Sequence, residues 1–467
     1  MIPGRVVHCI RVSFGLGLLF AAGVSGQQNS LFQGSVPGGA VSPTPLNLTL
    51  DDAIRRSLKF NLGLLESQSA SQTARADRIQ ALSALLPQVG GTFSETDEQL
   101  NLKTFGFNVP PNPYLTIPTI VGPFSYTAAE ASVSAKVIDF NARRNLKSAR
   151  AAEQAAQLSL QDARDLVVQA TANAYLLVIA DASRVRAIQA QTDTDQALYQ
   201  RASDQHTAGV AAAIDVLRAQ VQLKTEQQAL LAQQDQFDKD KLALGRVIGL
   251  RAAQVFGVAD VAPFSPLTAV GQEEALRTAL AQRPDYQSAQ RLVDAAQQTL
   301  AAARAEWYPT VDLNGFYGDE GTTLASSHGV FSIVGALNFN IYTGGRIHAD
   351  MEKARAALKQ RSDELADLGA QIEVEVRDAF LDLRSTADQV TVARENLGLA
   401  NQTLSQAQDR FSAGVTDNIE VVQAQESVAD ANDAYIASLY RYNTSKISMA
   451  RAIGIAESNY ALYLKGQ

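Results

Sequence analysis

The feature that most constrains this chain is a helix-compatible stretch longer than any compact domain could enclose. Residues 145–206 contain no proline and no glycine, the two residues that most often interrupt a helix. As one continuous α-helix, this stretch would be roughly 90 Å long at 1.5 Å per residue. Helices of that length form coiled coils, bundles or tubes. We therefore expect an elongated and mainly helical architecture.

Apolar residues recur within the long segments at alternating steps of three and four, the spacing of a coiled-coil seam. Gly209 interrupts the first segment, and a helix resumes at Ile214 and runs to about Ile248. We therefore predict a long helix hairpin at 145–250 and a matching one at 346–455. The two apolar stripes are Leu160, Ala163, Val167, Ala170, Ala174 and Leu177, and Leu365, Leu368, Ile372, Val376, Ala379 and Leu383.

The chain contains two copies of one plan. Ala53 and Ala275 lie near the start of two helical stretches that Pro87 and Pro309 close, and both pairs differ by 222 (275 − 53 and 309 − 87). Proline ends a helix because it lacks the amide hydrogen. Two further pairs share an offset of 205, namely Gly209-Val210 with Gly414-Val415, and Ile248-Gly249 with Ile453-Gly454. We predict an internal duplication, with a first repeat at 27–250 and a second at 251–467 that ends in a C-terminal tail.

Each half also contains segments in which polar and apolar side chains alternate, the pattern of a β-strand with two unlike faces. We predict one strand pair within 88–138 and another within 310–342. Glu130 and Lys136 fall on the polar face of the first pair. A strand of about 10 residues with one apolar face suits a barrel between lipid and water. An amphipathic strand of a soluble sheet would show the same alternation.

Four strands are too few to close a pore, so a membrane barrel would have to be shared between chains. Beyond residue 27 we find no stretch that approaches the length of a transmembrane helix. If the chain crosses a membrane, we expect it to do so with strands.

The first residues indicate export. Arg5 and Arg11 flank a basic start, an apolar run covers residues 12–24, and small residues follow. This pattern is typical of a secretory signal peptide, which we place at 1–26. Its removal would take the formal net charge from −8 to −10, because it contains two arginines and no acidic residue. Cys9, the single cysteine, lies within it. An acidic exported chain is a poor nucleic-acid binder.

The order signal peptide, helix, strand pair and long helix hairpin, repeated once, resembles the TolC-like outer-membrane efflux channels. The resemblance covers essentially the whole mature chain. Its most specific marks are two matched hairpin-tip motifs, GVAAAIDVL at 209–217 and GVTDNIEVV at 414–422. It implies a mainly α fold with β: a homotrimer whose twelve strands form one transmembrane β-barrel and whose twelve helices form a periplasmic α-barrel.

The same resemblance implies location, partners and function. The channel would lie in the outer membrane of a Gram-negative-type cell and extend into the periplasm. It would contact outer-membrane lipid, a periplasmic adaptor (a membrane fusion protein) and an inner-membrane pump. Within a tripartite efflux or type I secretion system, it would passively export small molecules or proteins.

The resemblance also implies a periplasmic gate on the inner helix of the second hairpin. Glu420 matches one of the family's acidic gate positions, and Gln423 occupies the next, where some members carry a second acid. Thr416 stands where some members carry a gate-linking arginine. Asp215 and Asp417 are further carboxylates beside the two turns, and threefold symmetry would convert inward-facing carboxylates into rings that favour cations. Alternatively, Glu420 is an ordinary acid favoured by the dipole at a helix start.

The hairpin tips are the candidate docking sites. Gly209 and Gly414 permit the positive-φ turn that ends a helix. Val210 and Val415 would then expose apolar side chains, which either dock the adaptor, as the resemblance suggests, or simply hold each hairpin together.

The aromatic pair Trp307 and Tyr308 precedes the second strand pair. The two rings either lie at the membrane interface, where amphipathic rings are favoured, or pack against the preceding helix.

No motif in the sequence indicates catalysis. A nucleophile elbow, a phosphate loop and zinc-ligand spacing are absent, and His206, His328 and His348 lie far apart. We expect no enzyme, no cofactor and no metal site. A periplasmic coiled-coil scaffold or adaptor without a pore is the alternative, but it does not explain paired strands in both halves. Beyond the leader the only methionines are Met351 and Met449, which favours organic cargo over copper ions. The sequence identifies neither the cargo, the adaptor, the pump nor the resting state of the gate.

Overall fold

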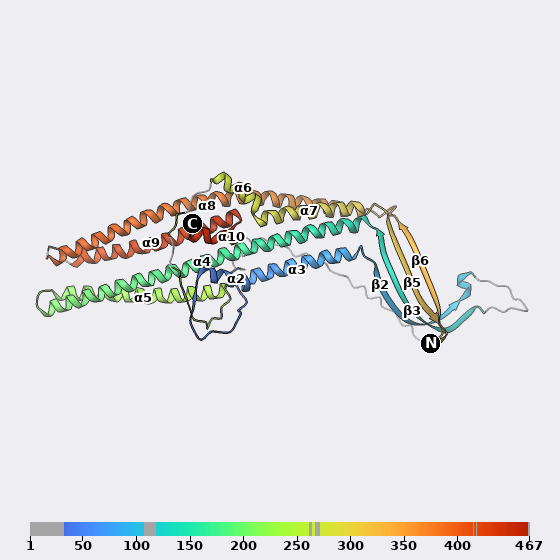
Figure 1. Cartoon of the computed structure of the whole chain (residues 1–467), viewed down its shortest axis with the longest axis horizontal. Helices are drawn as coiled ribbons and strands as arrows, with labels where there is room; N and C mark the ends of the chain where they lie inside the picture. The colour runs from blue at the N-terminus through green and yellow to red at the C-terminus, as the bar shows by residue number, and fades with distance from the viewer. Residues whose placement is uncertain are drawn as a thin grey trace, which may run out of the picture.

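The protein is elongated, with long helices along one axis and a β-sheet at one end (Figure 1). The structure, a computed structural model, describes residues 32–106, 118–260, 264–266, 271–413, 415–416 and 418–465. The predicted signal peptide at 1–26 lies outside these ranges, as do Gly414 and Asp417.

The first half contains two short helices, a strand pair and one long hairpin. Its elements are, in order, β1 (Leu46–Leu48), α2 (Leu50–Phe60), α3 (Leu62–Ser83), β2 (Gln88–Asn101), the 3-10 turn η1 (Leu102–Phe105), β3 (Ile120–Ile138), α4 (Phe140–Thr207), α5 (Ala213–Val247) and β4 (Phe256–Val258).

The second half has the same helix pair, strand pair and long hairpin, but its described residues form no counterpart of β1 or β4, and it ends in an additional helix. Its elements are α6 (Gln272–Gln282), α7 (Pro284–Ala305), β5 (Thr310–Gly321), the 3-10 turn η2 (Leu324–Ser326), β6 (His328–Asn338), α8 (Arg346–Ser412), α9 (Asn418–Ile453) and α10 (Ala456–Lys465). In Figure 1 the hairpins α4–α5 and α8–α9 lie side by side, with their tips at the end opposite to the strands.

Each helical stretch expected before a strand pair is in fact two helices. In the first half the break is at Asn61, whose Oδ1 accepts a hydrogen bond from Leu64 N at 3.4 Å and so caps α3. In the second half the break is at Arg283, followed by Pro284 at the start of α7. Proline fits the first turn of a helix but disfavours helix in the residue before it. The helical spacing of apolar residues continues through both breaks. Periodicity alone therefore did not reveal that each stretch is two helices.

The sheet is antiparallel, with the strand order β2-β3-β5-β6. Val89 pairs with Val133, Val133 with Gly315, and Gly315 with Ile333, so that one row of residues crosses all four strands. β1 and β4 form a separate parallel pair that joins the two ends of the first half.

Two element boundaries differ from those predicted. β6 ends at Asn338 rather than at Tyr342, because the chain turns toward α8 through Gly344 and Gly345, which have φ values of 60° and 86°. α4 begins at Phe140 rather than near residue 145, because Asp139 caps it by accepting a hydrogen bond from Ala142 N at 2.8 Å.

The main hydrophobic core lies midway along the long helices, where α2, α6 and α10 pack around α4, α8 and α9. Tyr175 is fully buried in it and donates a hydrogen bond to Leu48 O at 2.8 Å. In α8 half of the predicted stripe is buried, namely Ile372, Val376 and Ala379, and its other three residues are half-buried. In α4 only Ala163 and Val167 of the predicted stripe are buried; the remaining four residues are half-buried.

The expectation that nothing beyond the leader resembles a transmembrane helix was wrong. Among the described residues, one helix, α4, is long and apolar enough to cross a membrane by length and composition. Within the protein, 56% of its apolar window is buried. A helix that is mostly buried in a protein core passes the same test of length and composition.

Candidate functional site

The tip of the first hairpin is a tight turn centred on Gly209, which has a φ of 76°. Val210 N donates to Gln205 O at 2.9 Å, and His206 Nδ1 lies 2.9 Å from Ala211 O. The Val210 side chain is 75% exposed. The backbone of the turn is therefore closed by its own hydrogen bonds, and its apolar side chain faces away from the protein.

The tip of the second hairpin contains the predicted gate residues. Glu420 accepts a hydrogen bond from Thr416 Oγ1 and forms an ion pair with Arg410, with 3.3 Å between Arg410 Nη1 and Glu420 Oε1. Glu420 thus joins the end of α8 to the start of α9. Val415 is 70% exposed, like its counterpart Val210.

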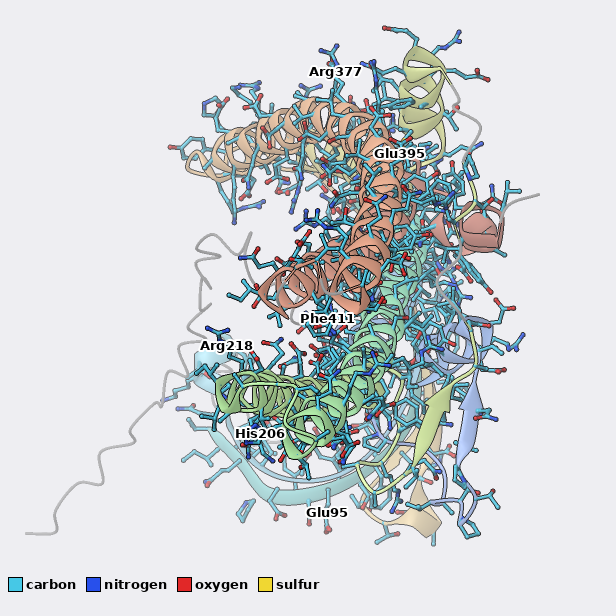
Figure 2. The ribbon with its side chains drawn as sticks, turned by 90° about the vertical axis from the view of Figure 1, so that its left-hand side faces the viewer. Glu95, His206, Arg218, Arg377, Glu395 and Phe411 are labelled. Carbon is cyan, nitrogen blue, oxygen red and sulfur yellow. The ribbon has the colours of Figure 1, made fainter. Side chains whose placement is uncertain are left out.

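A groove of about 470 Å³ separates the two tips. Ile214, Leu217 and Val221 of α5 face Ile419 and Val422 of α9 across it. The predicted gate residue Gln423 also lines this groove. Figure 2 shows the hairpins from this end, with His206 and Arg218 on the first hairpin and Phe411 on the second. Of the candidate docking and gate residues that the structure describes, Gln423 thus lines this partly apolar groove.

Asp215, the remaining predicted gate residue, lies one turn into α5. Its Oδ1 is 3.6 Å from Arg218 Nη1. The two hairpins therefore each tie an acidic residue to an arginine of the same hairpin, and the described residues contain no ion pair that joins the two tips.

At the other end, the strand register sorts side chains onto two faces. One face carries large apolar side chains, each at least 40% exposed: Val89, Phe93, Val133, Leu313, Tyr317, Phe331, Ile333 and Leu337. Glu130 and Lys136 are on the opposite face, together with Asn314 and Ser332. An exposed apolar face of this size suits contact with lipid.

The aromatic pair lies at the base of the strands. Tyr308 is 58% exposed, and its ring makes an edge-on contact with Phe140, with ring centroids 5.7 Å apart. Trp307 is 48% exposed. Tyr308 thus packs on the start of α4, while both rings keep exposed surface close to the first residue of β5.

A buried ion network, which the sequence analysis missed, joins four helices in the middle of the molecule. Arg283 is 2% exposed; its Nη2 lies 2.6 Å from Asp285 Oδ2 and its Nη1 lies 2.5 Å from Glu375 Oε2. Arg451 Nη2 lies 2.6 Å from Asp162 Oδ1. Burial raises the pKa of Asp162 to about 6, although Arg451 opposes this shift. The available signal was the Arg283-Pro284-Asp285 run at the helix break, but its partners come from distant segments.

The sequence model of the family described as outer membrane efflux protein matches this chain twice, over residues 53–250 and 275–455. Together these segments make up more than half of the chain. The chain therefore belongs to the outer membrane efflux protein family.

Individual relatives agree with this assignment. The toluene efflux pump outer membrane protein TtgC of Pseudomonas putida is 26% identical over 347 residues, which cover 71% of this chain and 69% of TtgC. The pyoverdine export outer membrane protein OpmQ of Pseudomonas aeruginosa is 23% identical over 419 residues, which cover 87% of this chain and 85% of OpmQ.

The fold agrees as well. The outer membrane protein VceC of Vibrio cholerae superposes with a TM-score of 0.73 at 20% identity, covering 87% of this chain and 96% of VceC. The resemblance to TolC-like channels is thus confirmed. The protein is an outer-membrane efflux channel that extends into the periplasm, and the alternative of a scaffold without a pore is not supported.

Proposed function

We propose that three copies of this chain form one passive duct across the outer membrane and periplasm, docked to a periplasmic adaptor and an inner-membrane pump. The observation that carries this proposal is the open four-stranded sheet with one apolar face. Four strands cannot enclose a pore, and three copies would supply twelve.

The two edges of the sheet support the trimer. β2 and β6 each pair on one side only. In lipid, unpaired backbone groups cost several kcal/mol each, so sheets that cross a membrane close into barrels. Pairing β6 of one copy with β2 of the next, repeated by a threefold axis, would remove every edge.

The helical region has its own unpartnered surface. Ala170, Ala174 and Leu177, which belong to the seam predicted for α4, line an open groove of about 870 Å³ together with Leu166 and Leu242. Small side chains allow a neighbouring helix to approach closely. We place a helix of the adjacent copy in this groove, which would extend the helix wall into a tube.

The repeated order of elements supports a duplication of the whole plan. Helix pair, strand pair and long hairpin occur once in each half, and the family model matches each half separately. The repeat boundaries that we propose are 27–250 and 251–467. Each half would supply one strand pair and one hairpin to the common barrel.

We assign adaptor docking and gating to the hairpin tips. Val210 and Val415 offer exposed apolar contacts, and the groove between the tips has apolar residues from both hairpins in its walls. Glu420 would act as the acidic gate residue, held in place by Thr416 and Arg410. Some family members carry a second acid at the position of Gln423. The ring of gate carboxylates formed by three copies would therefore be less negative here than in those members. The duct itself performs no chemistry, and transport energy would come from the pump.

The cargo that we propose is a small organic molecule rather than a protein or a copper ion. TtgC is named for toluene efflux and OpmQ for pyoverdine export. The scarcity of methionine beyond the leader, with Met351 and Met449 alone, fits this choice because copper carriers use thioether ligands.

Two measurements test the duct. Native mass spectrometry of the purified protein should give three chains per particle; a monomer or dimer would contradict the shared barrel.

In planar bilayers the trimer should conduct ions with a cation preference. Glu420→Gln should reduce that preference by removing one charge per chain, whereas Glu395→Gln, an equal charge change on the exposed side of α8, should not. Unchanged selectivity in Glu420→Gln would remove the gate assignment and leave the duct standing.

A further inference from the structure

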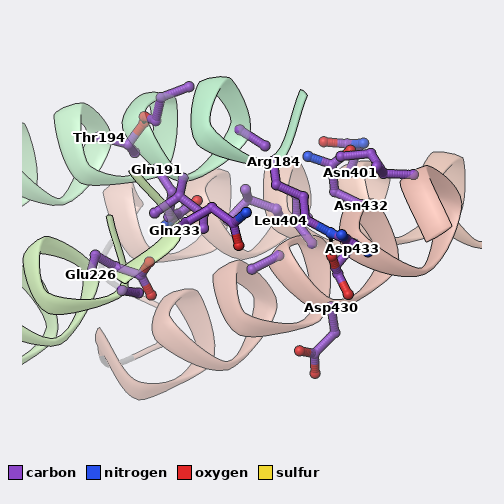
Figure 3. Close-up of a pocket in the computed structure, with 17 residues that line it drawn as sticks. Arg184, Gln191, Thr194, Glu226, Gln233, Asn401, Leu404, Asp430, Asn432 and Asp433 are labelled. Carbon is purple, nitrogen blue, oxygen red and sulfur yellow. Dashed lines mark hydrogen bonds and ion pairs between the residues drawn. The ribbon is translucent and has the colours of Figure 1, made fainter. Parts of the chain in front are cut away.

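A second cavity lies between the two hairpins, away from their tips. It has a volume of about 790 Å³ and is lined by α4 and α5 on one side and by α8 and α9 on the other (Figure 3). Pockets for small ligands typically measure about 300–1,000 Å³. Because a single chain supplies all of its walls, the cavity does not depend on the proposed trimer. We call it the inter-hairpin cavity.

The lining of the inter-hairpin cavity is partly apolar. Ile188, Leu404, Val428 and Ile436 contribute to its walls, together with several alanines. An apolar body that fills this space would remove its own surface and that of the walls from water, which favours binding. The walls therefore favour an organic ligand over a bare ion.

The charges of the cavity are unbalanced toward the acidic side. Its single cation, Arg184, is already engaged: its Nη1 lies 3.1 Å from Asp181 Oδ1 and its Nε lies 2.7 Å from Asp433 Oδ1. Glu226 and Asp430 also line the cavity, and neither carboxylate has an ion-pair partner among the residues that the structure describes. The cavity thus presents two carboxylates that no arginine or lysine neutralises.

Buried oxygen atoms behind the wall add to this imbalance. Asp195 is 2% exposed, and its Oδ1 accepts hydrogen bonds from Gln191 and Gln425, both at 3.1 Å. Asp195 Oδ2 and Gln425 Oε1 have no hydrogen-bond donor within the described part of the chain. A buried acceptor without a donor is unfavourable, because it has lost its hydrogen bonds to water. Gln191, one of the two donors to Asp195, is itself a lining residue of the cavity.

The pKa values of Asp195 and Glu226 agree with this lack of nearby positive charge. Burial, and then the charge of Glu226, raise the pKa of Asp195 to about 6. Burial and the neighbouring Glu426 raise the pKa of Glu226. Both shifts mean that the negative form of these side chains lacks a compensating positive charge.

We propose that the inter-hairpin cavity is a binding site for an organic cation, with its apolar body on the aliphatic wall and its positive charge near Glu226 and Asp430. Such a ligand would contact both hairpins at once. Its affinity would therefore depend on their separation, and a ligand that prefers one separation would shift the hairpins toward it.

The test uses the purified full-length protein in detergent, with tetraphenylphosphonium as the probe. This ion carries a permanent positive charge, and tetraphenylborate is its anionic counterpart of similar shape. Isothermal titration calorimetry should detect tetraphenylphosphonium binding above the level of protein-free micelles and little tetraphenylborate binding. Glu226→Gln and Asp430→Asn should each weaken the dissociation constant about tenfold.

Two further variants separate this site from others. Asp235→Asn removes the same charge from the exposed side of α5 and should leave the affinity unchanged. Ala229→Trp, which fills the cavity from α5, should abolish binding. Size-exclusion chromatography and circular dichroism would show that each variant is folded.

Three outcomes would overturn the proposal. The first is a wild-type protein that binds no tetraphenylphosphonium beyond the micelle level. The second is equal affinity for the cation and the anion. The third is binding that survives Ala229→Trp and Glu226→Gln but disappears in Glu420→Ala, which would place the cation at the hairpin tip.

Discussion

The two helix breaks, at Asn61 and at Arg283, occupy corresponding positions in the two halves, since 283 − 61 equals the offset of 222. At each break a positive-φ glycine from the end of a long hairpin packs against the chain. A Cβ on Gly249 would lie 2.5 Å from Phe60 Cβ, and a Cβ on Gly454 would lie 2.8 Å from Arg283 Cα. We call these the first joint and the second joint; they share one backbone arrangement.

The first joint is held largely by backbone hydrogen bonds from the N-terminal segment. Val36 N donates to Phe60 O at 2.9 Å, and Leu62 N donates to Gly34 O at 3.0 Å. Asn61 is fully buried, and its Nδ2 donates to Phe32 O at 2.6 Å. The polar groups freed by the break are thus satisfied by a neighbouring strand-like segment.

The second joint is held by ions. Arg283 pairs with Asp285 in the first turn of α7 and with Glu375 on α8, and Arg451 of α9 pairs with Asp162 of α4. The break and its glycine are therefore common to both joints, whereas the side chains that stabilise each joint differ. The second joint, unlike the first, links four long elements, so we expect its loss to affect the whole helical region.

The largest effect is expected for Arg283→Met, which would leave Asp285 and Glu375 without their main partner. Breaking a buried ion pair from one side costs about 3–5 kcal/mol. Denaturant unfolding followed by circular dichroism would measure the loss. Arg291→Met, on the same helix but in an exposed pair with Asp294, should cost less than about 1 kcal/mol. Equal losses in both variants would show that the second joint does not depend on its ions.

The next effect concerns the feature that both joints share. Gly454→Ala should lower the free energy of unfolding by about 2–3 kcal/mol, because φ is 81° and the new Cβ would meet the Arg283 backbone. Gly249→Ala should cost a similar amount. Gly398→Ala, within α8 and in open space, should instead stabilise by about 0.5–1 kcal/mol. A tolerated Gly249→Ala would break the equivalence of the joints.

A smaller effect is expected for Asn61→Ala at the first joint. The change removes the cap of α3 and the donor to Phe32 O, and loss of a helix cap costs about 1–2 kcal/mol. Asn61→Ser, which keeps an acceptor for the cap, should lose less. If Asn61→Ala destabilised the protein as much as Arg283→Met, the contrast between a joint held by hydrogen bonds and a joint held by ion pairs would be wrong.

The smallest effect is a difference in pH dependence between the joints. Asp162 in the folded protein has its pKa raised by burial to about 6 from an ordinary value of 3.8. Between these values the folded state binds more protons than the unfolded state, so this group makes stability fall as pH rises from about 4 to about 6. Asp162→Asn should flatten that part of the stability curve, whereas Asn61→Ala should leave its slope unchanged. Parallel curves for Asp162→Asn and wild type would exclude this role.

Much of the architecture could be predicted because its signals are local. The steps of three and four along α8 placed Ile372, Val376 and Ala379 in the core, and the alternation around Glu130 and Lys136 placed them on the polar face of β3. The helix breaks at Asn61 and Arg283 were missed, since the apolar periodicity runs through them.

The candidate site was predictable only in part. The matched Gly-Val pairs led to both tips, and the chain turn at Gly209 follows from local backbone chemistry. The ties of Glu420 to Arg410 and Thr416 required the geometry of the turn. The inter-hairpin cavity and its carboxylates, Glu226 and Asp430, were not predictable, because they come from different hairpins.

The long helices, the four amphipathic strands and their repeated order therefore follow from the amino-acid sequence alone. These features depend on side chains within a few residues of one another, which periodicity and glycine or proline positions encode directly. Which residues of the α4 stripe are buried, and how Asp162, Arg283 and Arg451 meet, follow only from the packing of distant segments. Such contacts depend on the relative register of several helices, and a shift of one helical turn, about 5.4 Å, would separate every pair.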